Sequence, residues 1–183
     1  MFSLSKLTPL YQSYLSKPAA DRPIYQAARR SKPRKIVEMG MGTASRSLRL
    51  IGLCSQYHAV SEISFTGMDL FEGRPADQGE GITLKEAHCT LKATGARIQL
   101  APGGPYDCLA RLANALGKVD LLIFSADLDP QQLEQAWAYV PRLLGEHSLV
   151  FAQSVQPGGQ LCTRLVEHEE IGLLARGNHK RAA

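Results

Sequence analysis

The 183-residue chain carries a formal net charge of +4 and is 44% hydrophobic and 7% aromatic, the composition of an ordinary soluble globular protein. This length suits one domain that buries its own core without disulfides or metals. No apolar run reaches the ~18 residues of a membrane span and the N-terminus lacks the apolar core of a signal peptide, so we expect a cytoplasmic protein with no membrane partner.

Basic residues gather in two places, over 22–35 and at the C-terminus over 176–181. Such clusters can attract nucleic acid or an acidic substrate. Aromatic residues do not interleave with them and no nucleic-acid module is recognisable, so we favour a solvated surface over nucleic-acid binding. The basic N-terminal segment leaves a homodimer open.

The elements expected along the chain alternate between strand and helix. The first thirty residues predict one or two short helices outside the sheet. Strands are then expected at 36–39, 63–70, 97–100, 119–124 and 148–152, and helices at 43–57, 84–94, 106–116 and 133–144. The run "VDLLIF" is continuously apolar, as in a strand covered on both faces. This order predicts an α/β, Rossmann-like, doubly wound and mostly parallel sheet with helices on both faces.

The C-terminal segment departs from this alternation. "LCTRLVEHEEIGLLARG" has apolar and β-branched residues on both sides of Glu169, which predicts an antiparallel hairpin of two further strands. We therefore expect one domain with a helical extension at 1–34, a cofactor-binding core at 35–155, and a hairpin and tail at 156–183.

The cysteines predict reduced, buried thiols, because they form no C-x-x-C pair and lie in apolar segments. They are Cys54, Cys89, Cys108 and Cys162.

The stretch "KIVEMGMGTASRSL" places an acid and two glycines between the first strand and a helix. Ligands of open parallel sheets bind at such turns, beyond the carboxyl ends of the strands. The dinucleotide fingerprint G-x-G-x-x-G fails here, because Ser45 stands at its last glycine. An acidic-x-G-x-G-x-G pattern fits Glu38, Gly40 and Gly42, and departs only at Ala44.

This second pattern resembles the first motif of class I S-adenosylmethionine-dependent methyltransferases. The resemblance implies that Glu38, Gly40 and Gly42 hold the methionine end of S-adenosylmethionine. The chemistry agrees, since a carboxylate accepts bonds from an ammonium group and the N–H groups at a helix start suit a carboxylate. The alternative is that Glu38 is merely a charge at a strand end.

Two later segments continue the resemblance. "FTGMDLFEG" ends the second strand with Asp69, where the family has an acid for the ribose hydroxyls, and Leu70 then implies cover for the adenine. A carboxylate can grip two adjacent hydroxyls, although Asp69 can also be a solvent-facing loop acid. In "LAPGGP", Gly103 and Gly104 stand where the family's backbone meets the adenine, or form a plain turn.

The fourth strand, "VDLLIFSADLDP", is similar to that of the small-molecule O-methyltransferases. Those enzymes bind a divalent cation through carboxylates that end the fourth and fifth strands. The corresponding positions here are Ser125, Gln153 and Ser154, and neutral oxygens alone hold magnesium poorly. We therefore expect no metal site, and the resemblance leaves Ser125 as a cofactor contact.

Asp127 and Asp129 are the carboxylates nearest to the end of the fourth strand. Asp129 precedes Pro130 and is expected to cap the following helix. Asp127 is the better candidate for a general base toward an acceptor hydroxyl. The histidines form no spaced pair for a metal and no recognisable triad.

The leading hypothesis is a metal-independent S-adenosylmethionine-dependent methyltransferase acting on a small molecule. Its substrate contacts would come from the N-terminal helices, the loop at 71–81 and the C-terminal hairpin. A non-catalytic binding or scaffold protein of the same fold is the first alternative. An NAD-linked oxidoreductase is the second, disfavoured by Ser45 and by the lack of a substrate domain.

Overall fold

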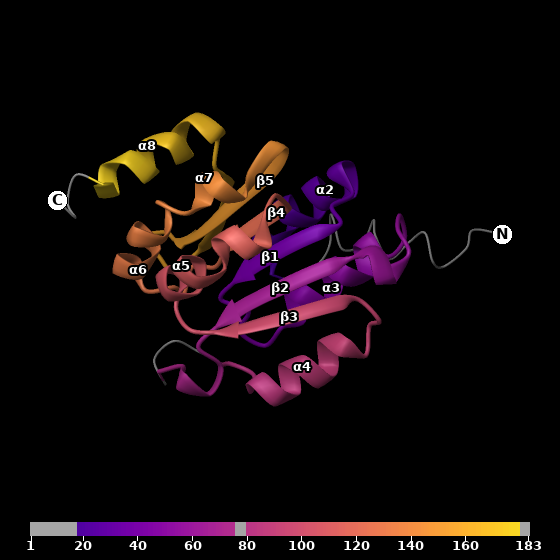
Figure 1. The fold of residues 1–183 in the computed structure, drawn as a ribbon. Coiled ribbons are helices and arrows are strands. Elements are labelled where there is room, and N and C mark those ends of the chain that lie inside the picture. The colour runs from indigo at the N-terminus through magenta and orange to yellow at the C-terminus, as the bar shows by residue number, and fades with distance from the viewer. Residues whose placement is uncertain (1–17, 76–79, 180–183) are drawn as a thin grey trace.

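The computed structural model describes residues 18–75 and 80–179, which form a six-stranded sheet between two layers of helices (Figure 1). The strand order is β3-β2-β1-β4-β5-β6. The strands are β1 (Lys35–Met39), β2 (Ser64–Asp69), β3 (Arg97–Pro102), β4 (Val119–Phe124), β5 (Leu144–Val155) and β6 (Leu161–Leu165). Strands β1 to β5 run parallel and β6 runs antiparallel to β5. The predicted Rossmann-like, doubly wound fold is confirmed.

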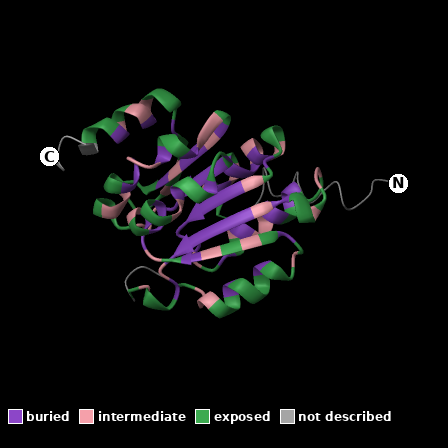
Figure 2. Ribbon diagram, in the orientation of Figure 1, coloured by how far each residue is buried: buried purple, intermediate pink, exposed green. Residues whose placement is uncertain are grey.

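Helices cover both faces of the sheet. They are η2 (Ala19–Asp21), α2 (Arg22–Ser31), α3 (Ser45–Cys54), η3 (Val60–Glu62), η4 (Phe71–Gly73), α4 (Leu84–Lys92), α5 (Pro105–Leu116), α6 (Pro130–Ala136), α7 (Val140–Leu143) and α8 (His168–His179). Apolar residues of α2, α3 and α4 form the core on one face, and those of α5 to α8 form it on the other. Figure 2 shows the central strands buried between these layers.

The two faces divide the residues of β1 between them. Ile36 packs into the core beneath α2 to α4, whereas Val37 and Met39 pack beneath α5 to α8. Successive side chains of a strand point to opposite faces, so Glu38 lies on the same face as Ile36 and faces α3. This register brings an acid into the interior.

The C-terminal antiparallel hairpin is confirmed, but its strands differ from the expected pair. It is formed by β5 and β6, with Phe151 opposite Leu165 and Val155 opposite Leu161. The segment after β6 is the helix α8, with Ile171 buried against the sheet. One hydrophobic face at helical spacing explains the apolar residues that suggested a second strand.

The helix expected over 133–144 is divided into α6 and α7, and Leu144 already belongs to β5. Pro141 explains the break, because it has no N–H for a bond to the carbonyl one turn earlier. Asp129 caps α6 as predicted, since its Oδ1 accepts the N–H of Gln132 at 2.8 Å.

The prediction of buried thiols is half right. Cys54 and Cys108 are buried, whereas Cys89 and Cys162 are exposed, and all four are free. Cys89 lies on the solvent side of α4, and Cys162 lies on the edge strand β6, where only one side of the strand is paired.

Of the N-terminal helices expected, α2 lies within the described residues and buries Ile24, Tyr25 and Ala28. Any helix within residues 1–17 falls outside them. In the part of the chain that the structure describes, no helix has the length and hydropathy to cross a membrane.

Candidate functional site

The glycine turn after β1 adopts the backbone that the acidic-x-G-x-G-x-G pattern implies. Gly40 and Gly42 have φ angles of 77° and 55°. Ala44 has a φ of 59°, so it takes the left-handed conformation that the third glycine of the pattern would take. The methyl group of an alanine makes this conformation cost about 1 kcal/mol. The departure at Ala44 therefore leaves the geometry of the turn intact.

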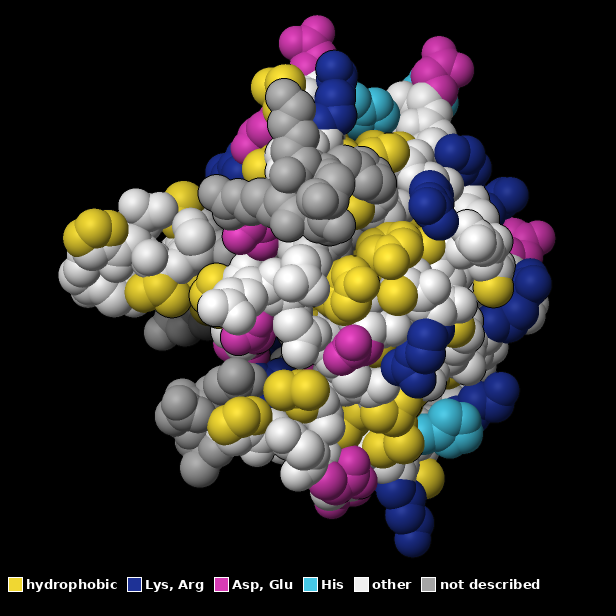
Figure 3. Space-filling model, turned by 60° about the vertical axis from the view of Figure 1, so that its left-hand side comes forward, with side chains coloured by type: hydrophobic (Ala, Val, Ile, Leu, Met, Phe, Trp, Pro, Cys, Tyr) yellow, Lys and Arg dark blue, Asp and Glu magenta, His cyan; other side chains and the backbone are white. Residues whose placement is uncertain are grey.

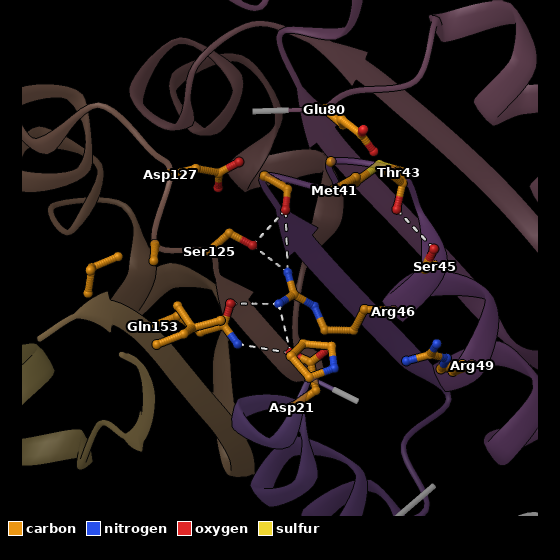
Figure 4. Close-up of a pocket in the computed structure, with 16 residues that line it drawn as sticks. Asp21, Met41, Thr43, Ser45, Arg46, Arg49, Glu80, Ser125, Asp127 and Gln153 are labelled. Carbon is orange, nitrogen blue, oxygen red and sulfur yellow. Dashed lines mark hydrogen bonds and ion pairs between the residues drawn. The ribbon is translucent and has the colours of Figure 1, made fainter. Parts of the chain in front are cut away.

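A cavity of about 560 Å³ opens beside this turn, at the carboxyl edge of the sheet. Its walls come from the turn, the start of α3, the ends of β4 and β5, and the N-terminal segment (Figure 4). They are Pro18, Asp21, Gly40, Met41, Gly42, Thr43, Ser45, Arg46, Arg49, Glu80, Ser125, Ala126, Asp127, Gln153, Val155 and Leu161. The three regions expected to contact a substrate, namely the N-terminal segment, the loop before α4 and the hairpin, all contribute to these walls.

Glu38 lies beneath the cavity rather than on its wall, and its side chain is fully buried. Arg46 Nε donates to Glu38 Oε1 at 2.7 Å, and Ser47 Oγ donates to Oε2 at 2.7 Å. Both oxygens therefore have internal partners. The prediction that Glu38 holds a ligand's ammonium group does not fit this geometry, because a fully buried carboxylate needs its compensating charge inside the protein.

Arg46 connects five segments of the chain around this acid. All five of its guanidinium N–H groups have acceptors, and its side chain is only 10% exposed. The acceptors are Glu38 Oε1, Asp21 Oδ1 at 3.2 Å, Gln153 Oε1 at 2.7 Å, the Gly40 carbonyl at 3.3 Å and Ser125 Oγ. Figure 4 shows the guanidinium between Asp21, Ser125 and Gln153. We call Arg46 and these acceptors the Arg46 cluster.

Burial governs the ionisation of this cluster. It raises the pKa of Glu38. Arg46 and Ser47 lower that pKa, but by less than burial raises it. For Arg46, burial lowers the pKa, but the carboxylates of Glu38 and Asp21 raise it by more. Arg46 is thus a permanent internal cation.

Asp69 ends β2, as predicted, and lines a second cavity rather than the 560 Å³ one. Its carboxylate also has internal partners. The Gly42 N–H donates to Oδ2 at 2.9 Å and the Phe71 N–H donates to Oδ1 at 3.1 Å. Arg74 Nη2 lies 2.9 Å from Oδ1 and 2.7 Å from Oδ2. Arg74 Nη1 donates to Asp127 Oδ2. We call Asp69, Arg74 and Asp127 the Arg74 bridge.

The predicted adenine contacts converge on a second, much smaller cavity of about 30 Å³. Leu70, Gly103 and Gly104 line it together with Arg74 and Gln132. The Gln132 amide lies close to Gly104, where an added Cβ would come within 1.8 Å of its Oε1. Arg74 and Gln132 therefore leave little free space beside Leu70, Gly103 and Gly104.

Asp127 borders both cavities. Its Oδ2 binds Arg74, whereas its Oδ1 is buried and has no hydrogen-bond partner among the described residues. A buried acceptor without a donor is costly, so this oxygen is suited to receive a ligand's proton or N–H group.

The positions implied for a divalent cation do not fit one. Ser125 and Gln153 both bind the guanidinium of Arg46, and Ser154 is exposed. Within residues 18–75 and 80–179, no group of three or more His, Cys, Asp or Glu side chains has the arrangement to hold a metal ion. A metal ion here would lie against a permanent positive charge.

Sequence reasoning missed three residues of this site. Arg46 was discoverable, because it lies in the first turn of the helix after Glu38, eight residues on. Asp21 and Arg74 gave no signal, since they come from an N-terminal 3₁₀ helix and an irregular loop.

Comparisons with known proteins agree on the fold. No protein-family model matches the sequence and no curated protein is found as a relative. Among solved structures, the O-methyltransferase TomG from Streptomyces achromogenes, in complex with S-adenosylmethionine, is 15% identical, with a TM-score of 0.58 over 99% of this chain and 78% of that one.

Two further structures give the same result. A Clostridium thermocellum protein provisionally described as an rRNA methylase is 14% identical, with a TM-score of 0.57 and coverage of 91% and 82%. A methyltransferase dependent on S-adenosylmethionine from Agrobacterium tumefaciens is 11% identical, with a TM-score of 0.51, and this chain spans 47% of its length. At such identities the likeness establishes the fold. The chain therefore has the fold of the S-adenosylmethionine-dependent methyltransferases.

Proposed function

We propose that the protein is an S-adenosylmethionine-dependent methyltransferase that acts on a small molecule without a divalent cation. One observation carries the proposal: a turn with left-handed residues at Gly40, Gly42 and Ala44 opens onto the 560 Å³ cavity at the carboxyl edge of a methyltransferase-type sheet. That volume lies within the ~300–1,000 Å³ typical of small-molecule sites.

The site would accommodate the methionine end of the cofactor as it stands, whereas the nucleoside end requires Arg74 to move. The turn, the N-terminus of α3 and the acids Glu80 and Asp127 give the large cavity groups for an amino acid's carboxylate and ammonium. At the other end, Asp69 would accept the ribose hydroxyls between Leu70 and Gly103, once Arg74 no longer occupies that carboxylate. Glu38 supports the turn from below through Arg46 and does not touch the ligand.

When bound, S-adenosylmethionine supplies an activated methyl group, so the protein's main task is to align the acceptor. Asp127 is the proposed general base. Asp127 lines both cavities, and its buried Oδ1 has no hydrogen-bond partner among the described residues, so we propose that it takes the proton of an acceptor hydroxyl. Arg46 would act through the protein rather than on the substrate, because all of its donors are occupied.

A small acceptor is favoured over nucleic acid by the surface charges. Figure 3 looks at the side of the molecule toward which β1, β2 and β3 point in Figure 1, and on this face acidic and basic side chains are interspersed. Binding to a phosphate backbone favours a face with basic residues gathered together.

Calorimetry with S-adenosylhomocysteine tests the cofactor proposal. We expect the full chain to bind it with a Kd on the order of 10–100 μM, and NAD to give no heat. Asp69→Asn should weaken binding about tenfold, because an amide cannot accept from two hydroxyls as a carboxylate does. Glu170→Gln, which removes a surface carboxylate bound to Arg164, is the matched control. An absence of binding at millimolar ligand would remove the proposal.

A methylation assay on a panel of small phenols and catechols tests the reaction. EDTA should leave the rate unchanged, and Asp127→Asn should lower kcat by about 100-fold, far more than the roughly threefold change expected in cofactor affinity. A rate abolished by EDTA and restored by magnesium would contradict metal independence.

A non-catalytic protein of the same fold is the second candidate, because the Arg74 bridge occupies the nucleoside end of the site. Cofactor binding without turnover on any acceptor would favour it.

A further inference from the structure

Asp69 has no lone pair left for a ligand in this structure. A carboxylate offers about four acceptor sites, two on each oxygen. At Asp69 these are used by the N–H groups of Gly42 and Phe71 and by the two contacts from Arg74 Nη2. Two backbone donors are fixed by the turn and the chain after β2, so only Arg74 can be exchanged for another donor.

The Arg74 side chain also occupies the space that a ligand's diol would need. It is 6% exposed and, with Gln132, leaves only about 30 Å³ in the small cavity. That is room for roughly one water molecule. A nucleoside whose ribose hydroxyls bind Asp69 therefore cannot coexist with the Arg74–Asp69 contact.

The contact between Arg74 and Asp69 can nevertheless be broken in exchange for other donors. Arg74 follows η4 in an irregular segment, outside any helix or strand. The side chain of its second partner, Asp127, is 32% exposed and borders the large cavity. Two carboxylates share this one guanidinium, so Arg74 can leave Asp69 and stay paired with Asp127 when other donors reach Asp69.

We infer that Arg74 is a specificity-determining residue that competes with the vicinal diol of a nucleoside for Asp69. The inference rests on the proposed function, since it takes Asp69 as the diol-binding group. Measured affinity is then the intrinsic affinity reduced by the fraction of molecules in which Arg74 has left Asp69. Ligands without a diol gain nothing from its departure.

Arg74→Ala is the direct test, with binding of S-adenosylhomocysteine measured by calorimetry on the full chain. Removal of the competitor should tighten binding about tenfold relative to the unaltered protein. Asp127→Asn removes the carboxylate with which Arg74 stays paired after it leaves Asp69, so it should weaken binding, by about threefold. Arg164→Ala is the matched control, because Arg164 also pairs with a carboxylate, that of Glu170, but on the surface.

The diol dependence separates competition from a merely structural role. Adenosine and 2′,3′-dideoxyadenosine should differ in affinity by a larger factor in Arg74→Ala than in the unaltered protein. If the unaltered protein binds S-adenosylhomocysteine and Arg74→Ala binds it no more tightly, the inference is wrong and the proposed function stands. If no variant binds it, both are wrong. Binding by Arg74→Ala alone supports both. Should Arg74→Ala fail to fold, Asp127→Asn decides: weaker binding than that of the unaltered protein supports the inference, and unchanged or tighter binding overturns it.

Discussion

Two arginine–carboxylate groups lie at the carboxyl edge of the sheet, and they differ in how firmly the protein holds them. In the Arg46 cluster the arginine comes from the first turn of α3, and its five donors bind acceptors from five segments. In the Arg74 bridge the arginine comes from a loop and binds two carboxylates, one of them 32% exposed. The same kind of ion pair thus stabilises the fold in the Arg46 cluster, whereas in the Arg74 bridge it occupies a binding site from which a ligand can displace it.

The largest expected effect is on the Arg46 cluster. Arg46→Ala leaves Glu38 and Asp21 buried without their cation, which should lower the free energy of unfolding by about 3–5 kcal/mol. Urea denaturation followed by circular dichroism measures this. Arg164→Ala, which breaks an exposed pair, should cost no more than about 1 kcal/mol. Equal losses in the two variants would contradict a framework role for Arg46.

The second-largest expected loss of stability is at Gly40, which lies between the two groups. An added Cβ would lie 2.7 Å from Ser125 Cβ and 2.8 Å from Asp127 Oδ1, at a φ of 77°. Gly40→Ala should therefore lower the free energy of unfolding by about 2–3 kcal/mol. Gly52→Ala in α3 is the control, since its Cβ meets nothing within 4 Å, and it should stabilise the protein by up to about 1 kcal/mol. Destabilisation by both changes would point to general intolerance of alanine instead.

Loss of the Arg74 bridge should cost less than loss of the Arg46 cluster. Arg74→Ala should lower the free energy of unfolding by about 1–2 kcal/mol, because Asp69 keeps two backbone donors and water from the neighbouring cavity can replace the guanidinium. The same urea experiment checks this value. If Arg74→Ala lowered the free energy of unfolding as much as Arg46→Ala, Arg74 would also have a structural role. That result would contradict the contrast between the two groups.

The smallest effect is a pH dependence next to the Arg46 cluster. Burial, and then the charge of Asp21, raises the pKa of Tyr25 from 10.0 to about 12. A raised pKa in the folded state means that Tyr25 contributes stability below pH 10, and that this contribution is lost as the pH rises to about 12. As the pH rises from 10 to about 12, the free energy of unfolding should therefore fall by on the order of 1 kcal/mol less in Tyr25→Phe than in the unaltered protein. Urea midpoints at the two pH values measure it, and identical losses would contradict burial of the phenol.

The fold was largely predictable from the sequence, whereas the pairing of charges in the site was not. Apolar runs such as that of β4 report burial directly, and the glycine turn and the acid ending β2 lie where their motifs place them. Motif reasoning assumes that a strand-end acid faces a ligand, but Glu38 faces the interior because of its register in β1. Two acceptors of the Arg46 guanidinium, Asp21 and Gln153, are 132 residues apart and meet only in the folded chain. Arg74 lies in a loop, where no periodicity tells the direction of a side chain.

A crystal structure of the full chain grown with S-adenosylhomocysteine tests the central claim most directly. We predict that the ribose hydroxyls bind Asp69 beside Leu70 and Gly103, that Arg74 pairs with Asp127 alone, and that the Arg46 cluster is unchanged. An empty site at millimolar ligand, with Arg74 still bound to Asp69, would contradict the account.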